Sequence, residues 1–389
     1  LSGGGSLSNT NTLVLNHANS LLTLAGILTI GDVEGTAASN SDKGIKVTSS
    51  ATIGDYDLSA VSYLAIAADK TLGGQLNLQS GGVLKTSGDG QYTGDTALAG
   101  GKLSATDSQV LSGTLSITAD SELAVSQGYT LTLSQTGGLA LGANTLTLSG
   151  GGSFVSGGLD LDNASSKLLL NSITVDSVST SLASLGLDVD ADSTVSSLSV
   201  GHTTPVSIAS SKTLSGAITV SAGSIKLGET GTLASSVSMS GGILDADQSM
   251  TISGALTQSG SITIDVSTGN TLTYSGASLS FGANTLTLSG GGTFSNTNAL
   301  VLNNASSKLL LDSITVDSVR TSLASLGLDV DANSTVSSLT VGHTTPVSIA
   351  SGRTLSGAIT VSAGSIKLGE AGTLASSVSM SGGTLDADE

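Results

Sequence analysis

The chain has 389 residues, of which 52 are glycine, 2% are aromatic, and none is cysteine or tryptophan. Acidic residues outnumber basic ones by 29 to 12, so the formal net charge is −17. This charge lacks the basic footprint that nucleic-acid binding needs, and it disfavours binding to anionic membranes. Disulfides and thiolate sites are excluded, and no apolar run approaches the roughly 20 residues of a membrane span. Membrane insertion is therefore not expected.

A long block of sequence is repeated nearly three times along the chain. The sequence LSGGG opens residues 1–5 and returns at 148–152 and 288–292, which defines blocks 1–147, 148–287 and an incomplete 288–389. Residues 163–247 and 304–388 are identical at 77 of 85 positions, whereas the first block has diverged further. Such copies favour a function of length or multivalency, because a catalytic site needs to be built only once.

Short segments in which apolar and Ser/Thr residues alternate dominate the local pattern, as in 145–148, 217–220 and 261–264. A period of two predicts β-strands with one apolar face and one polar face. Between them stand clusters of Gly, Asn and Asp, as in 240–242 and 268–270, which permit the positive φ angles of tight corners. The sequence therefore predicts an all-β protein of short strands.

A shorter period lies inside the long one. Leu214, Leu233, Ile252 and Leu272 follow one another at nearly equal spacings along the chain. This predicts a parallel β-helix, or β-solenoid, with coils of roughly 20 residues, about seven coils per block, and one continuous rod through all three blocks. At a strand spacing of about 4.8 Å, each block would add roughly 34 Å. The alternative is a tandem array of β-sandwich domains, which usually have longer strands and a core aromatic residue.

One stretch, residues 176–186, breaks the alternation. Val178, Leu182 and Leu185 stand at i, i+4 and i+7, with a possible cap at 176 or 177 and a glycine stop at 186. A short helix at one corner, recurring at 317–327, therefore competes with an ordinary coil that has a longer turn.

The acidic run at Asp188, Asp190 and Asp192 is the one candidate for a metal site, since alternate carboxylates could converge on Ca²⁺. Alternation equally directs all three carboxylates to solvent, and the second copy replaces the third by Asn333. No cofactor is expected beyond this weak calcium candidate. Other carboxylate pairs are predicted to be solubilising charges that discourage lateral aggregation: Asp160 with Asp162, and Asp245 with Asp247.

The chain has three histidines, His17, His202 and His343, and the last two occupy the same position in two copies. His202 stands in a Gly/Pro turn with no cysteine and no second histidine nearby, which favours a structural turn residue over a metal ligand or a general base. No nucleophile elbow stands out in so serine-rich a chain, and the glycine-rich runs lack the lysine of a phosphate loop. We therefore expect no enzyme activity. A polysaccharide-degrading β-helix and an ice-binding solenoid are minor alternatives. The latter depends on outward Thr-x-Thr pairs: Thr130/Thr132, Thr145/Thr147, Thr271/Thr273 and Thr285/Thr287.

The TLTLSGGG signature at 145–152 and 285–292, the Asn-Thr-Leu motif and the cysteine-free coils resemble the repeat regions of large bacterial surface and secreted proteins. Autotransporter passengers and filamentous-haemagglutinin-like adhesins are the nearest such families. The resemblance covers essentially the whole chain and is compositional and periodic. It implies export, a β-helical rod, and a role in adhesion, a surface coat or an extracellular fibre.

These observations predict a non-enzymatic structural fibre at the bacterial cell surface or outside the cell. Because the chain begins without methionine, we expect it to be a segment of a longer protein. A filament could grow by pairing of open coil edges between subunits or by covalent continuation of the repeats, and we favour continuation. The alternative function is the stalk of a surface adhesin that carries a distal binding domain or itself binds glycans on host or neighbouring cells.

Overall fold

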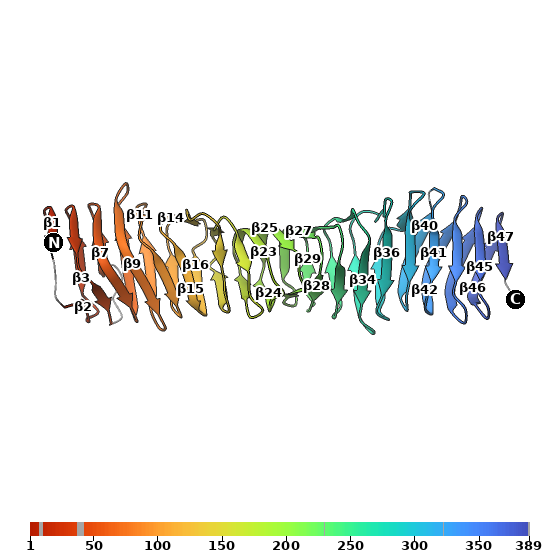
Figure 1. Ribbon diagram of the computed structural model, residues 1–389, viewed down its shortest axis with the longest axis horizontal. Coiled ribbons are helices and arrows are strands. Elements are labelled where there is room, and N and C mark those ends of the chain that lie inside the picture. The colour runs from red at the N-terminus through yellow and green to blue at the C-terminus, as the bar shows by residue number, and fades with distance from the viewer. Residues whose placement is uncertain (8–10, 37–42, 229, 322, 388–389) are drawn as a thin grey trace. The chain divides into compact units, whose positions relative to one another are not determined.

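The structure is a computed structural model that describes residues 1–7, 11–36, 43–228, 230–321 and 323–387. The chain forms two compact units, Leu1–Ser196 and Ser197–Glu389, and each is a parallel β-solenoid. In each unit, the coils build two sheets (Figure 1). Every coil contributes one strand to the first sheet, which we call the one-strand sheet. It contributes up to two short strands, or one long bent strand, to the second, which we call the two-strand sheet. The units divide inside β25 (Ser193–Val200), within the second predicted block.

The strands of the first unit belong to these two sheets. The one-strand sheet comprises β3 (Leu21–Leu24), β6 (Gly44–Val47), β8 (Val61–Ile66), β10 (Val83–Ser87), β13 (Lys102–Ala105), β16 (Ser121–Val125), β19 (Thr145–Ser149), β22 (Lys167–Asn171) and β24 (Gly186–Ala191). The two-strand sheet comprises β1 (Gly5–Leu7), β2 (Leu13–Leu15), β4 (Leu28–Ile30), β5 (Val33–Gly35), β7 (Ala51–Leu58), β9 (Thr71–Gln79), β11 (Gln91–Tyr92), β12 (Thr96–Ala99), β14 (Gln109–Leu111), β15 (Leu115–Ala119), β17 (Thr130–Leu133), β18 (Leu139–Ala140), β20 (Ser153–Val155), β21 (Leu159–Leu161) and β23 (Thr174–Thr180).

The second unit repeats this arrangement. Its one-strand sheet comprises β26 (Thr204–Ile208), β28 (Ser224–Leu227), β31 (Ile243–Ala246), β34 (Ile262–Val266), β36 (Thr285–Ser289), β39 (Lys308–Leu311), β41 (Gly327–Val330), β43 (Pro346–Ile349), β45 (Ser365–Leu368) and β47 (Thr384–Ala387). Its two-strand sheet comprises β27 (Thr213–Val220), β29 (Thr232–Leu233), β30 (Ser236–Met239), β32 (Met250–Ile252), β33 (Leu256–Gln258), β35 (Thr271–Tyr274), β37 (Thr293–Asn296), β38 (Leu300–Leu302), β40 (Thr315–Thr321), β42 (Ser334–Val341), β44 (Thr354–Val361) and β46 (Thr373–Met380).

Aliphatic side chains stack directly on one another from coil to coil. In the first unit, Leu84 lies opposite Leu103, which lies opposite Leu123, and this column continues through Leu148 and Leu170. All five are 0% or 1% exposed. Burial of each such side chain stabilises the fold by about 1.5–3 kcal/mol, so the column is a continuous source of stability along the unit. The alternation of the strands thus produces the dry interior that the sequence predicted.

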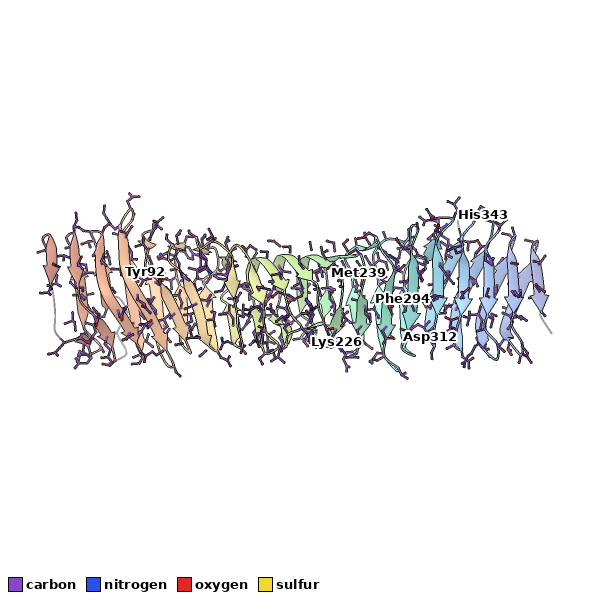
Figure 2. All side chains as sticks on the ribbon, in the orientation of Figure 1. Tyr92, Lys226, Met239, Phe294, Asp312 and His343 are labelled. Carbon is purple, nitrogen blue, oxygen red and sulfur yellow. The ribbon has the colours of Figure 1, made fainter. Side chains whose placement is uncertain are left out.

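The few aromatic residues reinforce the interior. Tyr274 on β35 and Phe294 on β37 stack with ring centroids 6.5 Å apart and an interplanar angle of 19°. Phe294 and Met239, both labelled in Figure 2, are completely buried. Tyr56 is also buried, and its hydroxyl lies 2.7 Å from the hydroxyl of Ser62. Loss of solvation raises the pKa of Tyr56 to about 12, while the hydrogen bond with Ser62 acts in the opposite direction.

The predicted inner period is confirmed, with one change of register. Leu214 lies opposite Leu233, and Leu233 lies opposite Ile252. The next coil is longer, so Ile252 lies opposite Tyr274, and Leu272 instead lies opposite Met250. A shift of two residues keeps every side chain on its original face, and the core therefore tolerates it.

The fold decides between the two architectures that the sequence left open. Pairing between the named strands is parallel throughout the described residues, from β1 with β4 to β45 with β47. A β-sandwich would place antiparallel strands in two facing sheets. The prediction of a β-solenoid is therefore confirmed, and the sandwich alternative is wrong.

The alternative of a corner helix is also wrong. Residues 174–180 form β23 and residues 186–191 form β24, and the described part of the chain contains no helix. Val178 is buried opposite Leu159, whereas Leu182 and Leu185 are 50% and 55% exposed. The three residues spaced like one helical face therefore do not share an environment. Pairing with the preceding coil holds Val178 in a strand and overrides the local helical spacing.

Candidate functional site

Lysines gather on the outward face of the one-strand sheet, where alternation points every second side chain to solvent. This face carries seven of the twelve basic residues of the chain. In the first unit these are Lys46, Lys85, Lys102 and Lys167, and in the second unit they are Lys226, Lys308 and Lys367. Because the chain as a whole is acidic, this outward face is the most distinctive surface of each unit, and we treat it as the candidate site.

Four of these lysines pair with a carboxylate on the next coil. The Nζ atom lies 2.6 Å from the carboxylate for Lys102–Glu122, 2.5 Å for Lys167–Asp188, 3.2 Å for Lys226–Asp245 and 2.6 Å for Lys308–Asp329. The hydrogen bond with Asp245, together with the negative charges of Asp245 and Asp247, raises the pKa of Lys226. Exposed pairs of this kind contribute about 0–1 kcal/mol each. They align neighbouring coils more than they stabilise them.

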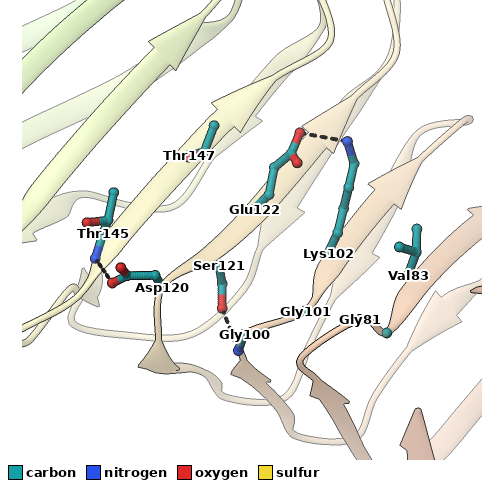
Figure 3. A pocket seen from close by; sticks show the side chains of 11 residues that line it. Gly81, Val83, Gly100, Gly101, Lys102, Asp120, Ser121, Glu122, Thr145 and Thr147 are labelled. Carbon is teal, nitrogen blue, oxygen red and sulfur yellow. Dashed lines mark hydrogen bonds and ion pairs between the residues drawn. The ribbon is translucent and has the colours of Figure 1, made fainter. Parts of the chain in front are cut away.

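A shallow groove crosses the coils around Lys102 and Glu122 (Figure 3). Its volume is about 400 Å³, and Gly82 and Gly101 are among the residues that line it. Several of its polar groups already have partners within the protein. The Asp120 carboxylate accepts a hydrogen bond of 2.7 Å from the backbone N–H of Thr145, and the Ser121 hydroxyl accepts one of 3.1 Å from Gly100. These bonds join one coil to the next, so the carboxylate of Asp120 and the hydroxyl of Ser121 are already engaged within the protein.

Lys46 and Lys85 differ from the four paired lysines of this face. Within the described residues, Lys46 on β6 and Lys85 on β10 make no ion pair. Instead, Lys85 lies over the ring of Tyr63, 5.2 Å from its centroid, and its Nζ is 3.3 Å from the Tyr63 hydroxyl. Beside Tyr63 is a pocket of about 370 Å³ whose walls include Leu21, Lys43 and Lys46. We call this feature the lysine–tyrosine pocket.

The aspartates suggested as calcium ligands lie on or beside β24. Asp188 is paired with Lys167, and Asp190 and Asp192 are exposed. Among the residues that the structure describes, no group of three or more His, Asp or Glu side chains is arranged to hold a metal ion. Lys167 therefore competes directly with any cation for the Asp188 carboxylate.

The histidines lie at corners. The Nδ1 atom of His17 accepts a hydrogen bond of 3.1 Å from the backbone N–H of Asn19. His202 is exposed, and its carbonyl accepts a hydrogen bond of 3.2 Å from the Thr204 hydroxyl. His343 is also exposed and has a φ of 56°, in the left-handed region. The position of His343, labelled in Figure 2, is that of a turn residue.

The outward threonine pairs are divided between the two sheets. Thr130 and Thr132 lie on the two-strand sheet, whereas Thr145 and Thr147 lie on the one-strand sheet. In the register of the coils, Thr145 lies opposite Lys167, and Thr147 opposite a leucine. The threonines of successive strands therefore do not form one unbroken array.

Carboxylates that the sequence suggested were solubilising charges have a second role, which is to join coils. One oxygen of Asp160 accepts hydrogen bonds of 3.1 Å from both the hydroxyl of Ser179 and the backbone N–H of Ser181. Asp162 accepts one of 2.8 Å from the N–H of Gly142 on the coil before it. The alternating sequence pattern correctly predicted that these side chains lie on the outside. It did not predict their hydrogen bonds, because the corner N–H groups that donate them belong to neighbouring coils.

The same arrangement recurs at Asp176 in one copy and at Asp317 in the other. The Asp176 carboxylate accepts bonds from the backbone N–H groups of Ser156 and Gly157, at 3.0 and 2.8 Å. Asp317 accepts from the hydroxyl of Ser295 and the N–H of Asn296, at 2.7 and 3.1 Å. We call such residues corner carboxylates. They satisfy donors at bends where the strand ladder is interrupted.

Comparison of the chain with protein-family models, with curated proteins and with solved structures finds no match in any of the three. The fold defines the class of protein, a parallel β-solenoid of short, repeated coils. Among the described residues, no helix is long and apolar enough to cross a membrane.

Proposed function

We propose that this protein is a non-enzymatic structural solenoid that forms part of a fibre at or outside a bacterial cell surface. The observation that carries the proposal is the duplication of residues 163–247 as 304–388. Both copies form the same succession of strands, for example β22, β23 and β24 in one and β39, β40 and β41 in the other. Duplication therefore adds further coils of the same kind, which is the expected result if length is the property being increased.

The way in which coils are joined supports this proposal. Each strand pairs with strands of the coils before and after its own, as β10 pairs with β8 and β13. An interior coil is therefore satisfied by its two neighbours, and more coils can be added without redesign of a core. Aliphatic columns, corner carboxylates and lysine–carboxylate pairs recur in both units. A fibre could grow by self-association of open coil edges or by continuation of the repeats within one chain.

The second candidate is an adhesin stalk that binds glycans, either through a distal domain or through its own face. One observation favours it, namely the lysine–tyrosine pocket on the outward face of the first unit. The extracellular location in both candidates is part of the proposal. It is supported by the resemblance of the serine-, threonine- and glycine-rich coils to the repeat regions of autotransporter passengers and filamentous-haemagglutinin-like adhesins.

Electron microscopy of the native protein, isolated from the cells that make it and labelled with an antibody against residues 163–247, tests the proposal. We expect continuous filaments that carry label at many places along their length. Discrete rods that end in a knob would favour the adhesin stalk instead. Label confined to the cell interior, or globular particles, would contradict both candidates. An antibody against residues 51–66, which have no near-identical copy, is the matched control, and it should label more sparsely.

A further inference from the structure

The lysine–tyrosine pocket lies where the outward face of the one-strand sheet is unusually basic. The strands β3, β6, β8, β10 and β13 contain no Asp or Glu, and the first carboxylate on this sheet is Glu122 on β16. The same five strands contribute Lys46, Lys85 and Lys102, and Lys43 directly precedes β6. In a chain with a net charge of −17, this is a local reversal of sign. Such a reversal favours an anionic ligand.

The nearest carboxylates in the sequence lie beyond the ends of these strands. Asp42 directly precedes Lys43 and lies outside the described residues, Asp69 follows β8, and Asp89 and Asp107 stand at the corners that follow β10 and β13. Asp107 is a corner carboxylate, because it accepts a hydrogen bond of 2.9 Å from the backbone N–H of Gly88. Lys102 is held by Glu122 at 2.6 Å. Lys46 and Lys85 therefore supply positive charge that the described part of this sheet leaves uncompensated.

A glycine lies between the strand positions of the two side chains that form the apolar wall of the pocket. In the register of the coils, Gly44 lies between Leu21 on one side and Tyr63 on the other. Gly44 has a φ of +114°, and a Cβ atom there would lie 2.3 Å from the carbonyl oxygen of Tyr63, so no other residue fits without movement. Leu21, which is 44% exposed, and Tyr63 line the pocket together with Lys43 and Lys46.

An apolar and aromatic wall next to uncompensated lysines matches one ligand chemistry better than others. The ring of an acidic sugar has an apolar C–H face that can pack on Tyr63 and Leu21, and it has a carboxylate that can bind Lys46 and Lys43. A volume of about 370 Å³ is large enough for a sugar unit and lies in the range typical of small-ligand pockets. A flexible acidic peptide would use the lysines but not the wall.

We propose that the lysine–tyrosine pocket binds a uronate residue of an acidic polysaccharide. Lys46 and Lys43 hold the carboxylate, Tyr63 packs on the sugar ring, and Lys85 keeps the tyrosine in place through its hydrogen bond to the Tyr63 hydroxyl. The proposal does not rest on filament formation, since all the residues involved lie within the first unit.

Isothermal titration of the complete chain tests the proposal with three probes: oligogalacturonate, a neutral galactose oligosaccharide of the same length, and polyglutamate. We expect oligogalacturonate to bind most tightly, with an affinity that falls as salt increases. The double variant Lys43→Gln/Lys46→Gln should bind oligogalacturonate at least about tenfold more weakly, the loss expected for charge-assisted contacts. Lys212→Gln, which removes one positive charge from a corner of the second unit, is the control and should bind like the wild type.

The variant Tyr63→Leu separates sugar recognition from simple charge attraction. It should lose the preference for oligogalacturonate over polyglutamate and keep its weak binding to both. No binding of oligogalacturonate by the wild type would overturn the proposal, as would equal affinity for polyglutamate or an equal loss in the Lys212→Gln control. Far-UV circular dichroism of each variant, with an unchanged strand signal, ensures that a loss of binding reports on the pocket and not on the fold.

Discussion

The two near-identical copies, residues 163–247 and 304–388, differ in a revealing way. None of the eight differences falls at a buried position in either copy. The differing pairs are Asn171/Asp312, Ser179/Arg320, Asp192/Asn333, Ser199/Thr340, Ser211/Gly352, Lys212/Arg353, Thr230/Ala371 and Ile243/Thr384. The stacked interior is shared, and variation is confined to the outside and the corners. This pattern follows from close packing, since a change of interior volume in one coil is felt by the coils on both sides.

Where the outside differs, contacts between coils change in pairs. Ser179 of the first copy lies opposite Asp160, which precedes that copy, and its hydroxyl donates a hydrogen bond to the Asp160 carboxylate. At the equivalent place in the other copy, Val301 lies opposite Arg320. A carboxylate with a hydroxyl donor is thus replaced by an aliphatic side chain against the long stem of an arginine. The outward face can exchange one kind of cross-coil contact for another while the strand register stays fixed.

Replacement of equivalent interior leucines should have the largest effect. Leu168→Ala and Leu309→Ala each remove a completely buried side chain from a column. Each should lower the local free energy of unfolding by about 2–5 kcal/mol, through lost burial and the cavity left behind. Amide hydrogen exchange of the flanking strands is the suitable measurement, because repeat proteins need not unfold in one step. The outward neighbour Leu169→Ala should cost less than about 1 kcal/mol. A control as costly as Leu168→Ala would contradict this contrast between inside and outside.

Alkaline pH should separate the diverged first block from the later copies. The pKa of Tyr56 is raised to about 12, and burial together with the charges of Asp95 and Asp55 raises that of Tyr92 as well. Neutral tyrosine is therefore favoured in the folded state. This contribution is complete below pH 10 and is lost as the pH rises from about 10 through 12, at up to about 3 kcal/mol for Tyr56. Thermal melts at pH 9 to 12 measure it.

The double variant Tyr56→Phe/Tyr92→Phe removes both titrating groups and is the control for this experiment. Its melting temperature should change less between pH 9 and pH 12 than that of the wild type. If the two proteins lose stability in parallel, the alkaline sensitivity arises elsewhere in the chain.

The corner carboxylates Asp176 and Asp317 occupy equivalent positions in the two copies but accept hydrogen bonds from different donors. Replacing each one tests whether the two copies depend equally on this contact. Asp176→Ala and Asp317→Ala should each cost about 1–3 kcal/mol, because each leaves partly buried donors without an acceptor. Asp331→Ala removes an exposed carboxylate from the same face pattern and should change stability by less than about 0.5 kcal/mol. Hydrogen exchange at Gly157 and Asn296 reports each corner directly. Unchanged protection at both N–H groups would show that these bonds do not hold the corners.

The smallest effect is expected at a corner where the copies use different residues for the same backbone conformation. Ser211 has a φ of 63°, its counterpart Gly352 has 65°, and Asp69 in the first block has 58°. Only glycine adopts this region without a steric penalty, so Ser211→Gly should stabilise its coil by about 0.5–1 kcal/mol, and Gly352→Ser should destabilise by a similar amount. Ser210→Gly, next to it without a positive φ, should not stabilise. A shift in melting temperature is the measurement.

Much of the fold could be predicted from the sequence, because the evidence is local and repeated. Alternation identified strands such as Thr145–Ser149, and the spacing of Leu214, Leu233 and Ile252 gave the coil length. The candidate site was a different matter. The lysine–tyrosine pocket depends on Leu21, Gly44 and Tyr63 lying opposite one another, although each belongs to a different coil and they are far apart in the sequence. No local pattern records which residues of successive coils meet.

The sequence by itself determined that the chain is built of short strands with a dry aliphatic face, since a period of two has only one way to bury its apolar side chains. It also determined that coils of nearly constant length repeat and that each long copy adds further coils of the same kind. Only the tertiary structure decided the register between coils, and with it the partners of every lysine and corner aspartate. The shift by two residues at Ile252 and Tyr274 shows the physical reason: loop lengths set the register, and a shift of two preserves the buried face. The apolar pattern of the interior therefore fits either register, and it does not specify which outward charges lie opposite one another.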